Sequence, residues 1–306
     1  MRISDIFNKK LDEESNVKSI GKITTDKASE IVRELSGGKL RQNKLLIDNI
    51  VVFVGASGGT GTSTLIANVA YTAAKAGLRV LVIDLNILFP VQQIYFGEKA
   101  SGKSIIDKPD LVKYLTGKCT LGEAIENNKN ISVMYSSNRG LMDLIDCESD
   151  SAVANFEEAL DRLRYLFDLI LIDTPLKIEN TLCNTAFYRS NCIYTVWDEG
   201  ISSISNIERI RRNMALSGID AYIKTKAILN KRTDIAYTHY PFKKLNMDLV
   251  QILPFDTSII NSSLRSEIFV QKASTSSKNA NIFYSCIQEL TTYILKNGGY
   301  VGDING

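Results

Sequence analysis

The feature that most constrains the fold of this chain is a series of short runs that are apolar on both faces. The runs lie at residues 50–55, 79–85, 131–135, 168–173, 192–197, 226–230 and 250–254. Strands of this kind are typical of a parallel sheet that helices cover on each side. Between the runs, segments such as 151–167 and 279–296 place apolar residues at helical spacing. This alternation predicts an α/β fold with a doubly wound, mostly parallel sheet flanked by helices.

Residues 1–47 differ from the rest of the chain, because they are charged, poor in aromatic residues and without a strong strand pattern. We therefore predict a charged N-terminal extension or linker at 1–47 and one α/β domain at 48–306. Within residues 1–11, Ile3, Ile6 and Phe7 fall on one helical face beside basic residues. Such a face suits docking on a partner or a membrane surface. A frayed amphipathic terminus with no role is the more ordinary interpretation.

Composition argues against several classes of protein. The net charge is +2, from 36 basic and 34 acidic residues, so no bulk field favours nucleic acid or an anionic membrane. No apolar run approaches the ~18 residues that span a bilayer. The cysteines are scattered, and the single histidine, His239, has no cysteine near it. A zinc site and a histidine-based catalytic triad are therefore not expected, and the simplest location for the protein is the cytoplasm.

A glycine-rich segment, GGTGTST at 58–64, directly follows the first apolar run and opens a helical stretch. Its glycines allow a tight turn in which backbone N–H groups converge on an anion, and the helix N-terminus adds partial positive charge. Ser63 fills the position whose hydroxyl ligates Mg²⁺ in a phosphate loop, whereas Thr62 stands where that loop has its lysine. The residues expected to contact phosphate are Gly58, Gly59, Thr60, Gly61, Thr62, Ser63 and Thr64.

Acidic residues end two of the predicted strands. Asp84 closes the run at 79–85 and Asp173 closes the run at 168–173. Ligands of α/β sheets bind at the carboxyl ends of the strands, so both carboxylates are expected beside the loop. We predict that Ser63, Asp84 and Asp173 hold Mg²⁺ when nucleotide is bound, with Asp84 as the candidate catalytic residue. Either aspartate alone could instead cap a helix or a turn.

These segments together resemble the ParA/MinD superfamily of deviant Walker P-loop ATPases. The matching stretches are SGGTGTSTLIANVA, VLVIDLN, FDLILIDTP, ILN and ILPFD, and the resemblance covers nearly all of residues 48–306. It implies ATP and Mg²⁺ as ligands. Asn230 matches the asparagine that usually reads adenine in that family, and Pro254 matches the proline of a turn near the base.

The chain departs from the family pattern at three positions. Ser57 and Thr62 replace the two loop lysines, and Asn86 replaces an acid that helps to orient the attacking water. A lost charge-assisted hydrogen bond costs roughly 1.5–3 kcal/mol, which is about tenfold to a hundredfold in affinity. Loss of a preorganised cation typically lowers a rate by about 10²–10³. We therefore expect a weak or inactive ATPase that still binds nucleotide.

The context GGxGT[ST]T and the segment 82–97 are similar to the CpaE/TadZ branch of the family. That branch implies a positioning or assembly factor for a pilus or secretion system. The resemblance implies protein partners in a membrane-associated assembly, a homodimer, and recruitment from the cytoplasm to the membrane or the cell pole. Two alternatives stay open. One is a slow ATPase of the partitioning or localisation type. The other is a regulator of polysaccharide export, because residues 110–137 resemble bacterial tyrosine kinases.

Overall fold

The computed structural model of the chain describes residues 48–97, 108–137, 140–175, 181–233, 240–272 and 277–299. All of them belong to the larger of two compact units, 44–306, into which the chain divides. The predicted extension at 1–47, with the amphipathic face of residues 1–11, lies outside the described residues, and so does His239.

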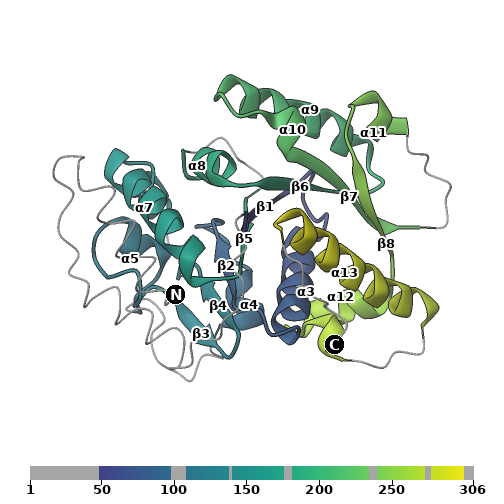
Figure 1. Ribbon diagram of the computed structural model, residues 1–306, viewed down its shortest axis with the longest axis horizontal. Coiled ribbons are helices and arrows are strands. Elements are labelled where there is room, and N and C mark those ends of the chain that lie inside the picture. The colour runs from purple at the N-terminus through teal and green to yellow at the C-terminus, as the bar shows by residue number, and fades with distance from the viewer. Residues whose placement is uncertain are drawn as a thin grey trace. The chain divides into compact units, whose positions relative to one another are not determined.

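The described residues form one eight-stranded sheet in the order β3-β4-β2-β5-β1-β6-β7-β8 (Figure 1). The strands are β1 Ile50–Gly55, β2 Val80–Asp84, β3 Glu126–Asn128, β4 Ile131–Met134, β5 Leu169–Asp173, β6 Cys192–Trp197, β7 Thr225–Arg232 and β8 Leu249–Pro254. Every pairing is parallel except the one between β3 and β4. The predicted doubly wound, mostly parallel α/β fold is confirmed.

The edge strand β3 was not predicted from the sequence. Its residues are polar and partly or fully exposed, and it pairs antiparallel with β4 at the edge of the sheet. An edge strand that buries neither face needs no apolar run, so the pattern that found the other strands could not find this one.

Helices connect the strands. They are α3 Thr62–Lys75, α4 Gln92–Phe96, α5 Leu111–Leu115, α6 Leu141–Asp146, α7 Asp150–Leu166, α8 Thr181–Arg189, α9 Ile201–Leu216, α10 Ala221–Lys224, α11 Tyr240–Lys244, α12 Thr257–Leu264 and α13 Lys278–Asn297, with a 3-10 turn at Phe269–Gln271. Serine side chains cap the longest two: Ser149 accepts from the N–H of Ala152 in α7, and Ser277 accepts from that of Ala280 in α13. Within the described part of the chain, no helix is long and apolar enough to cross a membrane.

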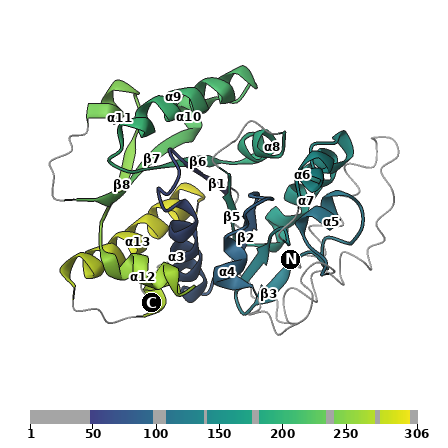
Figure 2. The same cartoon turned by 180° about the vertical axis from the view of Figure 1, so that it is seen from behind.

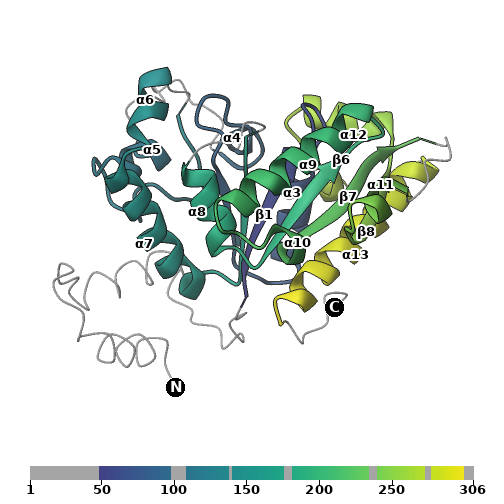
Figure 3. The same cartoon turned by 90° about the horizontal axis from the view of Figure 1, so that it is seen from above.

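The helices lie on both faces of the sheet. On one face, Val51 and Phe53 of β1 pack in a single apolar cluster with residues of α3 and α13, and α3 lies between α4 and α13 (Figures 1 and 2). Helices α7, α8 and α9 cover the opposite face, which is the nearer one in Figure 3. Because side chains of a strand alternate between faces, the fully buried Ile50 and Val52 point to that second layer.

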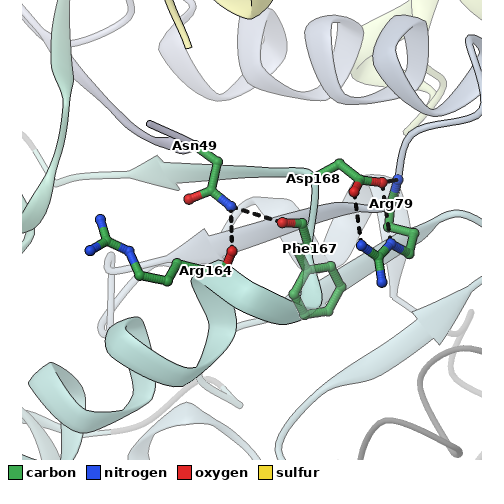
Figure 4. Close-up of polar contacts among 5 residues, drawn as sticks. All are labelled: Asn49, Arg79, Arg164, Phe167 and Asp168. Carbon is green, nitrogen blue, oxygen red and sulfur yellow. Dashed lines mark hydrogen bonds and ion pairs between the residues drawn. The ribbon is translucent and has the colours of Figure 1, made fainter. Parts of the chain in front are cut away.

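Polar contacts fix the amino ends of the central strands (Figure 4). Asp168, just before β5, accepts from the backbone N–H of Arg79 at 2.8 Å and from the guanidinium Nη2 at 2.8 Å and Nε at 3.2 Å. The amide of Asn49, just before β1, donates to the carbonyls of Arg164 and Phe167, each at 2.8 Å. These bonds set the register in which β1, β2 and β5 enter the sheet.

Candidate functional site

The glycine-rich segment forms a loop between the central strand β1 and helix α3. Gly59 and Gly61 have φ angles of 80° and 86°, in the left-handed region that favours glycine. A Cβ on Gly61 would also lie 2.7 Å from the side-chain nitrogen of Asn230. Gly61 is the N-cap of α3, so the free N–H groups of the first helical turn face the space beside the loop.

Distant parts of the sheet hold the loop in place. The N–H of Ala56 donates to the carbonyl of Val196 at 2.8 Å, and the side-chain amide of Asn230 donates to the carbonyl of Thr60, also at 2.8 Å. The hydroxyls of Thr60 and Thr62 lie 3.1 Å apart beneath the loop. Asn230, expected to read adenine, therefore contacts the loop backbone in this structure.

A cavity of about 450 Å³ opens beside the loop at the carboxyl ends of β1, β5, β7 and β8. The predicted site residues that line it are Gly58, Gly59, Thr60, Gly61, Thr62, Ser63, Thr64, Asp173, Asn230 and Pro254. The lining also includes the apolar side chains of Phe255, Ile259, Ile260, Leu264 and Phe283. The cavity thus combines a loop of backbone donors with apolar side chains suited to contact a flat apolar group.

Asp173 and Ser63 meet inside this cavity. The Ser63 hydroxyl hydrogen-bonds to the Asp173 carboxylate, and the side-chain amide of Gln92 donates to Asp173 Oδ2 at 2.7 Å. Burial raises the pKa of Asp173 to about 6, against the effect of these hydrogen bonds. A carboxylate and a hydroxyl of this kind are the protein groups that hold Mg²⁺ in phosphate-loop sites.

Asp84 lies at the end of β2 as predicted but is not among the residues that line the cavity. Its carboxylate accepts from the backbone N–H groups of Asn86 at 3.0 Å, Val91 at 2.7 Å and Gln92 at 2.9 Å. Burial first, and the charge of Asp173 second, raise the pKa of Asp84 to about 7. Asp84 therefore organises the turn from β2 into α4. The predicted Mg²⁺ ligation and catalytic role of Asp84 stay predictions.

Neutral side chains occupy the two positions where the loop lacks lysine. The Ser57 hydroxyl lies 3.5 Å from Asp198 Oδ2 and 3.5 Å from the hydroxyl of Ser203. Thr62 is buried against Thr60. Both positions are thus satisfied by local hydrogen bonds without a positive charge.

Sequence reasoning missed two residues of this site. Gln92 is fully buried and links Asp173 to the carbonyl of Ser63, to which its amide donates at 3.1 Å. Lys231 directly follows Asn230 and donates from Nζ to the carbonyl of Gly59. Gln92 lies within segment 82–97, but nothing in that segment predicted its contact with Asp173. For Lys231 the one available signal was its position next to the predicted Asn230.

Comparisons with known proteins place the fold and the loop in a family context. A family model described as an AAA domain matches residues 48–225. The septum site-determining protein MinD of Helicobacter pylori is 24% identical over 245 residues, which is 75% of this chain and 86% of that protein. The structure of MinD complexed with Mg-ADP from Pyrococcus horikoshii OT3 has a TM-score of 0.64 at 18% identity, covering 80% of this chain and 95% of that one. The kinase domain of the Escherichia coli tyrosine kinase ETK has a TM-score of 0.50 at 20% identity, covering 62% and 71%. At these identities the likeness to solved structures shows the fold alone.

Proposed function

The chain belongs to the AAA domain family, within the ParA/MinD superfamily of P-loop ATPases, and from that premise we propose that it binds ATP with Mg²⁺ and hydrolyses it slowly or not at all. One observation carries the proposal. The loop, Ser63 and Asp173 line a single cavity, while Ser57 and Thr62 stand at the positions that the family fills with lysine. The parts that hold a nucleotide are thus together, and the cations that speed its cleavage are not at their usual places.

The residues present fit a bound Mg²⁺. Asp173 is buried, accepts from the neutral Ser63 hydroxyl and Gln92 amide, and has a raised pKa, so a divalent cation would offset its desolvation. Ser63 and Asp173 would hold the ion. When bound, Mg²⁺ would neutralise part of the negative charge of the phosphates. The loop N–H groups would hold the phosphates, and the apolar lining residues, among them Pro254 and Phe255, would contact the base.

Slow hydrolysis follows from what the cavity offers an attacking water. Asn86 lines the cavity, and a neutral amide does not take up a proton as a carboxylate does. Asp84 is the acidic residue nearest to Asn86 in the sequence, and its carboxylate already accepts hydrogen bonds from the backbone N–H groups of Asn86 and Val91. Without lysine at positions 57 and 62, charge that develops on the transferred phosphoryl group has fewer partners.

We propose that nucleotide binding lets this protein position other components of the cell. The relative named as a septum site-determining protein supports a role in placing other components. The GGxGT[ST]T context supports the CpaE/TadZ-like version of that role, in a pilus or secretion system. In this version the chain acts as a homodimer, contacts protein partners of a membrane-associated assembly, and is recruited from the cytoplasm to the membrane or the cell pole.

The test is calorimetric titration of ATP in the presence of Mg²⁺, run beside a phosphate-release assay. We expect micromolar binding with little or no phosphate release. Gly61→Val should abolish binding, because the side chain is strained at this φ and would collide with Asn230. Gly218→Val is the matched control, since Gly218 has a φ of 75° but open space around it. Rapid turnover would overturn the slow-hydrolysis proposal, and absence of binding at millimolar ATP would overturn nucleotide binding.

A further inference from the structure

The charges that face the cavity do not balance those of a nucleotide. Among the described residues that line it, Asp173 and Asp256 are acidic and Lys231 has the only basic side chain. A nucleoside di- or triphosphate brings several negative charges to the loop end. Backbone donors supply only partial charges there, so a side-chain cation near the loop matters more than in a site that keeps its loop lysine.

Lys231 reaches the glycine-rich loop from strand β7. It lies near the end of β7, its Nζ donates to the carbonyl of Gly59, and its Cε is 3.6 Å from the place a Cβ on Gly61 would occupy. The amine is therefore at the rim of the loop, beside the N-terminal turn of α3.

The backbone conformation of Lys231 directs its side chain toward the glycine-rich loop. Its φ is 56°, a left-handed value that residues other than glycine rarely adopt. The carbonyl oxygen of the Asn230 side chain accepts from the N–H of Lys231 at 2.9 Å, while the nitrogen of the same amide donates to Thr60. One asparagine thus fixes both the loop and the turn that brings the lysine to it. A strained residue held by its neighbours is common at ligand-binding sites.

We propose that Lys231 is a phosphate-binding residue, supplying from β7 the cation that position 62 of the loop lacks. This rests on the proposed binding of a nucleotide. Lys231 exchanges the neutral carbonyl of Gly59 for a charged phosphate oxygen, which is a stronger acceptor for an ammonium group. Its flexible stem and rotating donors allow that exchange without movement of the loop.

The experiment measures the affinities of ATP, ADP and adenosine for the full chain and for Lys231→Met. Loss of one charge-assisted hydrogen bond weakens binding by about tenfold or more, so we expect that loss for ATP and ADP. Adenosine has no phosphate, so its affinity should not change. Lys231→Arg should recover most of the ATP affinity. Arg232→Met is the matched control, because Arg232 is the next residue on β7 and does not line the cavity.

A second variant separates phosphate binding from a role in holding the loop. Thr62→Lys places an ammonium at the ordinary position, so it should restore ATP affinity to the Lys231→Met chain. If Lys231 only clamps the Gly59 carbonyl, Lys231→Met weakens adenosine and ATP alike and Thr62→Lys gives no rescue, which overturns the proposal. Unchanged ATP affinity in Lys231→Met also overturns it and leaves nucleotide binding intact. If the unmodified chain binds no ATP, the proposed function fails, and this inference fails with it.

Discussion

The two ends of strand β5 carry similar carboxylates in opposite electrostatic situations. Asp168, at the amino end, is buried and takes bonds from the backbone and guanidinium of Arg79 (Figure 4). Asp173, at the carboxyl end, is equally buried but accepts from a neutral hydroxyl and a neutral amide. At the amino end of β5, Arg79 neutralises the charge of Asp168 when the chain folds. At the carboxyl end, no cation of the described residues is bonded to Asp173, so a cation from solution can neutralise its charge, as in a binding site.

The largest change in stability is expected at the amino end of β5, where Arg79 pairs with Asp168. Arg79→Met removes the cation from Asp168 and leaves a buried carboxylate unpaired, which should cost about 3 kcal/mol of unfolding free energy. Denaturant unfolding at neutral pH measures this. Arg162→Met is the control, because its ion pair with Glu158 within α7 is partly exposed and should contribute less than about 1 kcal/mol. Equal losses of unfolding free energy in the two variants would show that the Arg79–Asp168 pair matters no more than a partly exposed ion pair.

The second largest change is expected at Asp173, where a substitution should raise the stability of the chain. The pKa of Asp173 is raised to about 6, so the charged carboxylate opposes folding. That cost is absent below the pKa of an unfolded aspartate, about 3.9, grows as the pH rises through about 6, and stays constant above it. Asp173→Asn should therefore stabilise the nucleotide-free chain by about 2 kcal/mol at pH 8 and much less at pH 4.

Asp168→Asn is the matched variant at the other end of the same strand. It should destabilise the chain at pH 8, because the amide cannot accept from every Arg79 donor. Unfolding free energies from pH 4 to pH 8 test the pair. A loss of stability at pH 8 in both variants would show that Asp173 is a structural residue like Asp168.

The smallest effect concerns Gln92, the neutral partner of Asp173. Gln92→Leu removes its amide donor and should cost about 1 kcal/mol at pH 8. The cost should shrink near pH 5, because a protonated carboxyl needs that donor less. Thermal unfolding at the two pH values measures the difference. Gln93→Leu is the control, since Gln93 is adjacent on α4 and its side chain makes no contact with Asp173 among those described. A pH-independent cost would show that Gln92 acts through packing alone.

The parts of this structure that follow from local patterns were predictable. The boundaries of β1 and β6 match the apolar runs at 50–55 and 192–197, because a strand buried on both faces must be apolar throughout. The glycine-rich loop was predictable because Gly58, Gly59 and Gly61 lie close together in the sequence, directly after the first apolar run. Asp173 followed from the position of its strand.

The remainder depends on contacts between distant residues. Gln92 meets Asp173 across 81 positions, and Lys231 meets Gly59 across 172. The regular spacing of residues within a segment does not predict contacts between segments that lie so far apart in the sequence. Asp84 illustrates a further limit: the sequence placed it correctly at the edge of the sheet. Only the hydrogen bonds from Val91 and Gln92 show that its oxygens are turned to the backbone.

The bond between Asn230 and Thr60 spans 170 positions, and this has a consequence for how the protein is made. The glycine-rich loop leaves the ribosome early, long before the strand that carries its support has been synthesised. Contacts of such wide sequence separation form late in folding, because the chain must close a long segment before gaining from them. A nascent or truncated chain that ends before β7 therefore has the loop sequence without the shaped loop, and the proposed nucleotide binding requires that β7 has been synthesised.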